Sequence, residues 1–252
     1  MLRIDVSWLT TTLLVAVRLA AATAMVPIFG TTRIPAIARI GVTIALSALL
    51  VAAMPAPPIA PESAIELAVA MGTEVFIGAA FAAGFAAAHG AAELAGRALD
   101  TQIGFGAAVL LNPATQTFSP LLGSLLSLLS IAVFMSLDGH LLLIQAISIS
   151  LASTPPGVVF SDFDWGALWR QAGLNFSFGL ALAAPVMFMF LLADMAMAVL
   201  ARSMPQLNVL VLGFAVKILL GLAGLAYAIQ FLQSAINQLF FATFGYWEQL
   251  AS

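Results

Sequence analysis

The 252-residue sequence has no cysteine, only two histidines and very few charged residues. Without cysteine, disulfide bonds, thiolate metal sites and cysteine nucleophiles are excluded. Charged residues make up 8% of the chain and hydrophobic residues 63%, against roughly 25% and 45–50% in soluble proteins. Because so few charges cannot cover a soluble globule of this size, the composition indicates an integral membrane protein. Eight Lys and Arg against eleven Asp and Glu also supply no basic patch for nucleic acid.

What the sequence has in abundance is long apolar runs, which predict an all-α fold. An apolar helix of about 17–25 residues spans the hydrocarbon core of a bilayer. The runs predict helices over residues 8–28, 37–54, 63–90, 91–111, 121–137, 141–151, 168–202 and 209–244. Asp138-Gly139-His140 predicts a turn capped by Asp138, and leaves open whether its flanking pieces form one bent helix or a hairpin. The proline-rich linker at 153–165 predicts a helical part over 1–160 and a helical hairpin over 161–252 that turns at 203–208.

Four ionisable side chains lie well inside these apolar helices, namely Arg18, Glu74, Asp194 and Lys217. A charge at the centre of a bilayer costs about 2.5–3.5 kcal/mol on insertion scales, so these groups must face protein, water or each other. Arg202 lies eight residues beyond Asp194, and Lys217 lies on the facing arm of the predicted hairpin. Asp194, Arg202 and Lys217 can therefore form one acid–base cluster. Its role stays open between a structural ion pair, a gating contact and a proton-carrying site.

Motifs that carry catalysis are missing from the sequence, which has no HExxH, P-loop or GxSxG pattern. His89 and Glu93 have the spacing of two metal ligands on a helix, but no further ligand accompanies them, so a packed or interfacial histidine is expected. Glu93 and Arg97 predict an i,i+4 ion pair, and Asp100 one turn beyond predicts a wet or paired helix face. Tyr246-Trp247-Glu248 is typical of a membrane interface. We therefore predict no enzymatic activity, cofactor or metal.

Motifs spread along the chain resemble, in the same order, those of the FliR family of flagellar biosynthesis proteins. They are Val26-Pro27-Ile28-Phe29-Gly30 with Ile34-Pro35-Ala36, Gly104-Phe105-Gly106 through Asn112-Pro113 and Ser119-Pro120, Leu137-Asp138-Gly139-His140, and Pro205-Gln206-Leu207-Asn208-Val209 with Gly213-Phe214 and Lys217. The resemblance covers nearly the whole chain. It implies a non-enzymatic core subunit of the flagellar type III secretion export gate, in which a P-like part is fused to a Q-like C-terminal hairpin.

The resemblance also implies partners, a location and site residues. The partners are the P-type and Q-type subunits FliP and FliQ, the membrane proteins FlhA and FlhB, the basal-body ring and unfolded export substrates. The location is the bacterial inner membrane at the flagellar basal body. In this family a loop plugs the closed pore, and the matching residues at about 104–120 are Gly104, Phe105, Gly106, Leu111, Asn112, Pro113, Gln116, Thr117 and Phe118. A second group combines the charged cluster with the hairpin turn, as Asp194, Arg202, Pro205, Gln206, Asn208 and Lys217.

Two alternatives to the flagellar interpretation stay open. A homologous subunit of a virulence injectisome would share the fold and export other substrates. A proton-coupled secondary transporter would use Asp194, Lys217 or Glu74, would work alone or as a small homo-oligomer, and would often contain internal repeats. The two halves of this sequence show no convincing repeat. The mass of the intact particle in mild detergent distinguishes a large hetero-oligomeric gate from a transporter.

Overall fold

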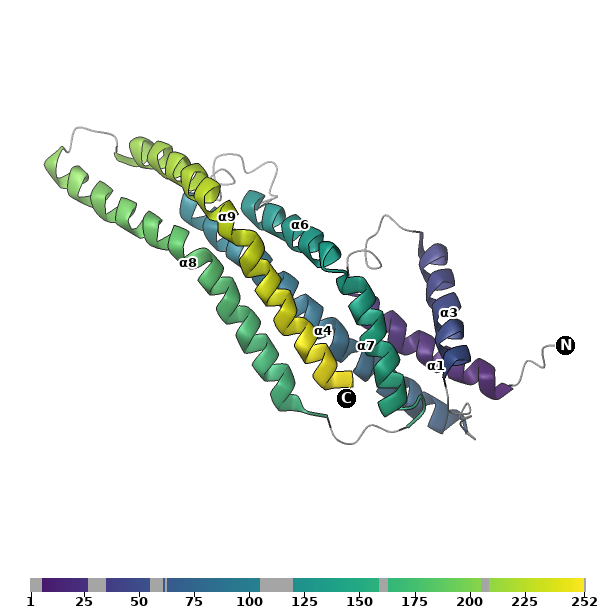
Figure 1. Ribbon diagram of the computed structural model, residues 1–252. Helices are drawn as coiled ribbons and strands as arrows, with labels where there is room; N and C mark the ends of the chain where they lie inside the picture. Colours follow the sequence, from purple (N-terminus) through teal and green to yellow (C-terminus); the bar gives the residue numbers. More distant parts are fainter. Residues whose placement is uncertain are drawn as a thin grey trace. The chain divides into compact units, whose positions relative to one another are not determined.

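The computed structural model describes residues 6–26, 35–54, 61, 63–104, 120–158, 163–204 and 209–251 (Figure 1). Its helices are α1 (Val6–Thr23), α3 (Ala36–Ala53), α4 (Ala64–Ile103), α6 (Leu121–Ser136), α7 (Gly139–Ser153), α8 (Trp165–Ser203) and α9 (Val209–Ala251). Within these ranges α1, α3, α4 and α8 are long and apolar enough to cross a bilayer, and α6 with α7 is a further candidate if the two form one interrupted span. The prediction of an all-α membrane protein with several spans is confirmed.

One helix replaces two of those predicted. Residues 64–103 form a single α4 of 40 residues, and the predicted junction at Gly90 leaves it unbroken. Gly90 is exposed, and most of the residues around it are alanines (residues 86–88, 91 and 92), which favour the helix strongly enough to carry it through one glycine. The helix ends at Ile103, eight residues earlier than the predicted end at 111. Gly104 follows with a left-handed φ of 88°, a backbone conformation that ends helices and that glycine adopts without strain.

The chain breaks between α6 and α7 at the predicted turn, and Asp138 takes the predicted N-cap position of α7, but its side chain does not form the cap. Asp138 has φ 52° and ψ 30°, the left-handed region that aspartate tolerates better than most residues. Its carboxylate makes no capping hydrogen bond. Instead its backbone carbonyl accepts from the N–H groups of Leu141 and Leu142 at 2.9 and 3.1 Å. The first turn of α7 is therefore closed by backbone geometry and not by the side chain.

The helices form two compact units, each assembled from separate segments of the chain. The first unit comprises Met1–Ala87, Asp138–Ala172 and Phe241–Ser252, and the second comprises Ala88–Leu137 and Gly173–Phe240. Helices α4, α8 and α9 contribute to both. The predicted division at residue 160 concerns the resemblance to P-type and Q-type subunits, and it stays a prediction.

In the first unit, the end of α9 packs its aromatic residues on α4. The Trp247 Nε1–H donates to the carbonyl of Phe81 at 3.0 Å, and the Tyr246 hydroxyl donates to the carbonyl of Ala80 at 3.1 Å. A Cβ at Gly84 would lie 2.9 Å from both aromatic side chains, so glycine is required for this approach. Burial raises the pKa of Tyr246 to about 12, because the charged phenolate would be desolvated there. The interfacial assignment of this tail was wrong, because both rings are buried.

The core of the second unit is apolar and joins four helices. It contains Ala95, Leu99 and Ile103 of α4, Leu122 and Leu126 of α6, Ala183, Val186 and Phe190 of α8, and Leu232 of α9. Small residues bring the helices together, since a Cβ at Gly179 would lie 2.8 Å from the carbonyl oxygen of Ala91. A Cβ at Gly221 would lie 2.7 Å from Ile103. These contacts hold α8 and α9 close to the second half of α4.

Candidate functional site

An ion pair with no solvent exposure joins α1 and α4 in the first unit. The Arg18 Nε–H donates to Glu74 Oε2 at 2.6 Å, and Nη2–H donates to Oε1 at 3.2 Å, a bidentate arrangement that fixes geometry as well as charge. One turn further along α4, a Cβ at Gly78 would lie 2.4 Å from the carbonyl oxygen of Arg18. The prediction that these two charges need a partner is confirmed, and each is the partner of the other.

The ion pair extends into a network that reaches α7 and the residues after it. The Arg18 guanidinium also donates to the carbonyl and hydroxyl oxygens of Ser150, at 3.1 and 3.0 Å, and to the carbonyl of Thr154 at 3.0 Å. Glu74 Oε1 accepts a further hydrogen bond from the Gly157 N–H at 3.2 Å. Protein atoms of one unit thus supply the hydrogen bonds of both charged groups. Arg18 and Glu74 therefore need no water-filled pathway to lie inside apolar helices.

A second ion pair joins α8 and α9 in the second unit. Lys217 Nζ lies 2.8 Å from Asp194 Oδ1 and 3.1 Å from Oδ2, and the two side chains are 25% and 45% exposed. Arg202 is exposed and forms no ion pair with any residue of the described ranges. The structure therefore brings together two of the three residues of the predicted cluster. The predicted turn residues Pro205, Gln206 and Asn208 lie outside the described residues.

Only one of the predicted plug residues can be located, and it is Gly104 at the end of α4. Phe105, Gly106, Leu111, Asn112, Pro113, Gln116, Thr117 and Phe118 lie outside the described residues. Gly104 and Pro120, which bound the predicted loop, both belong to the second unit.

Near these boundaries, Glu93 and Arg97 pair with each other as predicted, whereas Asp100 is paired with backbone groups away from water. Glu93 and Arg97 form the expected exposed ion pair, with Arg97 Nε 3.0 Å from Glu93 Oε1. Asp100 does not share this wet face. It is fully buried, and its carboxylate accepts the backbone N–H groups of Leu122 and Gly123. The spacing of residues along α4 could not predict these donors, because they belong to a different helix, α6.

His89 is a packed histidine, as expected from its isolation in the sequence. Its Nε2 lies 3.2 Å from the Ser127 hydroxyl oxygen, and its Nδ1 lies 3.4 Å from that of Ser130. Both serines belong to α6, so the imidazole joins α4 to α6 within the second unit. Across the described ranges, no group of three or more His, Asp and Glu residues is arranged to hold a metal ion.

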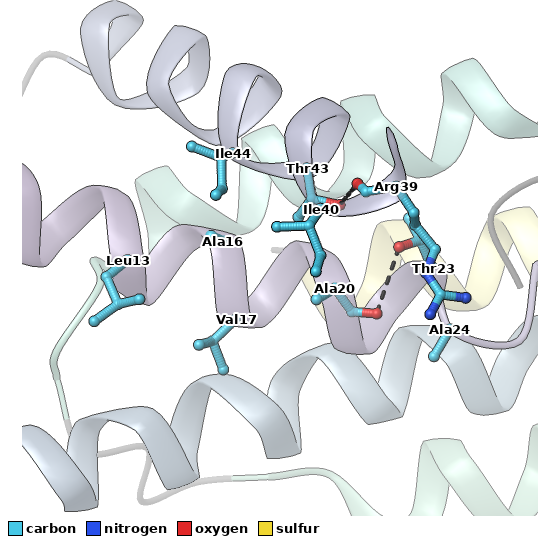
Figure 2. Close-up of a pocket in the computed structure, with 10 residues that line it drawn as sticks. All are labelled: Leu13, Ala16, Val17, Ala20, Thr23, Ala24, Arg39, Ile40, Thr43 and Ile44. Carbon is cyan, nitrogen blue, oxygen red and sulfur yellow. Dashed lines mark hydrogen bonds between the residues drawn. The ribbon is translucent and has the colours of Figure 1, made fainter. Parts of the chain in front are cut away.

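A cavity of about 430 Å³ lies between α1 and α3 in the first unit (Figure 2). Its lining residues are Leu13, Ala16, Val17, Ala20, Thr23, Ala24, Arg39, Ile40, Thr43 and Ile44. The Thr43 hydroxyl donates to the carbonyl of Arg39 at 2.9 Å, and the Thr23 hydroxyl donates to that of Leu19 at 2.7 Å. Both hydroxyls thus serve their own helices. The described lining residues give the cavity apolar walls and one guanidinium group, and none of them is an acid or a histidine.

The fold and these sites together define a multi-pass helical membrane protein whose interior charges pair within the chain. Residues 9–243 match the family described as bacterial export proteins, family 1. The chain belongs to this family.

Curated relatives have names that agree with this family. Flagellar biosynthetic protein FliR of Bacillus subtilis (strain 168) is 28% identical over 210 residues, which cover 82% of this chain and 81% of the relative. The protein of the same name from Escherichia coli (strain K12) is 28% identical over 152 residues, covering 60% and 58%. Yop proteins translocation protein T of Yersinia pestis is 31% identical over 128 residues, covering 50% and 49%. The resemblance to the FliR family is confirmed, although the chain spans little more than half the length of the Escherichia coli relative.

Proposed function

We propose that this chain is a core subunit of a flagellar type III export gate and forms part of the pore through which unfolded proteins leave the cell. The observation that carries the proposal is the family match over residues 9–243, together with a flagellar relative aligned over 82% of the chain. The subunit would act by assembly and gating, without covalent catalysis. Its partners would be FliP, FliQ, FlhA, FlhB and the basal-body ring, in the inner membrane.

The surface of the chain supports a role inside an assembly in a membrane. Large apolar side chains are exposed along several helices, including Ile37 and Leu49 of α3 and Trp169, Phe188 and Leu192 of α8. Exposed apolar surface on this scale is stable only against lipid or other protein. The ionic groups inside the helices are engaged in ion pairs or backbone contacts, which agrees with a structural subunit and favours the gate over a proton-coupled transporter.

Within this function, we assign closure of the pore to residues 104–119, following the family resemblance. Gly104 and Gly106 permit sharp bending, because glycine accepts backbone conformations closed to other residues. Val109–Leu111 supply an apolar seal, and Asn112–Thr117 are polar enough to meet water when the loop moves. In this assignment the apolar residues seal the closed pore, and the polar residues meet water when it opens.

Deleting Asn112–Thr117 is the direct test of this assignment. We expect the complex with its partner subunits to assemble at normal yield and mass, and the closed complex to conduct ions severalfold better after reconstitution into vesicles. Conductance is measured by dye release or planar-bilayer recording. Unchanged conductance in a complex of normal mass contradicts the plug. Failure to assemble also contradicts it, because these residues would then serve structure.

Lys217→Ala tests the second predicted site. In the isolated chain the ion pair with Asp194 is partly exposed, so its loss should cost no more than about 1 kcal/mol of unfolding free energy. In the assembled complex, neighbouring subunits would cover the pair, and the Lys217→Ala variant would then bury Asp194 without a counter-ion. Co-purification of the variant with those subunits should therefore fall strongly. Combining Asp194→Lys with Lys217→Asp restores the pair and should recover the yield. Normal co-purification of the Lys217→Ala variant would show that Lys217 does not contribute to the assembly interface.

One comparison favours a second candidate, the corresponding injectisome subunit. Yop proteins translocation protein T is 31% identical, although over only half of each chain. Complementation separates the candidates, because a flagellar subunit should restore motility to a strain that lacks its own copy. A purified particle that is a monomer or homodimer would instead support the transporter.

A further inference from the structure

The start of α6 is held against α4 by contacts that lie outside the proposed plug. The first N–H groups of any helix lack partners within the helix and need acceptors from elsewhere. Pro120 precedes α6 and provides no side-chain cap. The Leu122 N–H donates instead to Asp100 Oδ1 at 3.0 Å, and the Gly123 N–H donates to Oδ2 at 2.9 Å. A carboxylate one turn before the end of α4 therefore caps the beginning of α6.

The chemistry of this contact makes it strong. Asp100 has no solvent exposure, and each of its two oxygens accepts one amide hydrogen. Hydrogen bonds that involve an ionised group are roughly twice as strong as those between neutral groups. The N-terminus of a helix also has a partial positive charge that attracts an anion. Leu122 is buried in the same apolar core as Leu99, so the contact is shielded from water.

Two glycines bring the helix backbones together at this point. A Cβ at Gly96, one turn before Asp100, would lie 2.5 Å from the carbonyl oxygen of Leu122 and 2.6 Å from the Cα of Gly123. A Cβ at Gly123 would lie 2.9 Å from the Arg97 side chain. Any larger residue at Gly96 would push α6 away from the carboxylate. The approach is therefore required for the hydrogen bonds, and it sets the register of α6 on α4.

We infer that Asp100 is a positioning residue that fixes the start of α6 on the last turns of α4. Both helices belong to the second unit, so the residues that bound the connection 105–119 are held at one place relative to each other. The expected effect on the pore rests on the proposed function, because a plug loop can close the pore again only if its two ends stay in place. The capping contact itself depends only on the described residues.

Asp100→Ala in the full chain, assembled with its partner subunits, tests the inference. We expect hydrogen exchange of the Leu122 and Gly123 amides to accelerate about tenfold or more, as loss of hydrogen bonds to a charged group implies. We also expect ion leakage like that of the loop deletion, in particles of normal mass. Glu66→Gln is the matched control, because it removes one exposed acid from the first turn of the same helix, away from α6. It should change neither measurement.

Gly96→Ala provides an independent route if Asp100→Ala fails to fold, because it displaces α6 while the carboxylate stays in place. Faster exchange together with leakage in either variant supports the inference. Unchanged exchange in both variants overturns it. The variants can also show faster exchange without ion leakage, while the loop deletion does leak. That result overturns the inference and leaves the proposed function intact. If the loop deletion does not leak, the plug assignment fails, and faster exchange then supports the helix anchor alone.

Discussion

Replacing Glu74 with alanine is expected to destabilise the protein by about 3–5 kcal/mol, because the Arg18 guanidinium stays buried without its counter-ion. Net stabilities of domains are about 5–15 kcal/mol, so this change removes a large fraction of the total. The variant also removes the acceptor of the Gly157 N–H. Denaturant unfolding in mild detergent measures the loss, and the yield of folded protein should fall with it.

Two further variants show whether the loss comes from the ion pair. Glu66→Ala removes an exposed acid from the first turn of the same helix, and it should cost less than about 1 kcal/mol. Combining Arg18→Met with Glu74→Leu replaces both charges by apolar groups of similar length. This double variant should recover most of the stability, since a buried ion pair and a well-packed apolar pair are often of similar stability. A Glu74→Ala protein as stable as the wild type would show that the two residues are not paired in the protein.

Trp247→Ala is expected to produce a loss of similar size, about 3–5 kcal/mol, because it empties the site of a fully packed indole. Trp247 is 1% exposed, lies 5.6 Å from the ring of Phe244 and donates to the carbonyl of Phe81. Trp247→Phe keeps most of the packing and removes the hydrogen bond, so its cost should be lower. Thermal unfolding followed by circular dichroism measures both.

The control for Trp247 lies on the same helix. Phe241 is 58% exposed, so Phe241→Ala should have a small effect in detergent. If both alanine variants behave alike, the end of α9 is not packed on α4, and the interfacial character of Tyr246-Trp247-Glu248 would be correct after all. A much larger effect at Trp247 would support the packed arrangement.

The two interior ion pairs differ in a way that bears on the export gate. Arg18 and Glu74 are completely buried within one unit, and their network is complete without any other subunit. Asp194 and Lys217 are partly exposed, so a neighbouring subunit could change their energetics strongly. For this reason we expect substitutions at Glu74 to damage the chain itself, and substitutions at Lys217 to damage the assembly. The two classes of variant separate folding from complex formation.

Several features could be predicted from the sequence because they depend on composition or on local chemistry. Low charge and long apolar runs predict membrane helices whatever their arrangement. The Glu93–Arg97 ion pair could be predicted because i,i+4 neighbours meet on any helix. The motifs shared with the FliR family lie within the span of the family match, and their order along the chain is sufficient to indicate the family.

Other features depend on residues far apart in the sequence, and no local pattern contains them. Arg18 and Glu74 are 56 positions apart, and Asp100 lies 22 positions before its first donor. The signal that did exist was energetic, since a charge inside an apolar helix must have a partner. It could show that Arg18 must face protein, water or another charge, but it could not identify Glu74 as the group that pairs with it.

The sequence by itself determined that this is a helical membrane protein of the bacterial export family, because hydrophobicity and motif order are properties of the chain in one dimension. The tertiary structure alone decided which charges pair, that the aromatic tail is buried on α4, and that a carboxylate of α4 caps α6. The physical reason is that burial and hydrogen bonding depend on which helix faces lie against each other. Those faces meet only where close contacts, such as those at Gly78, Gly84 and Gly96, allow the backbones to approach.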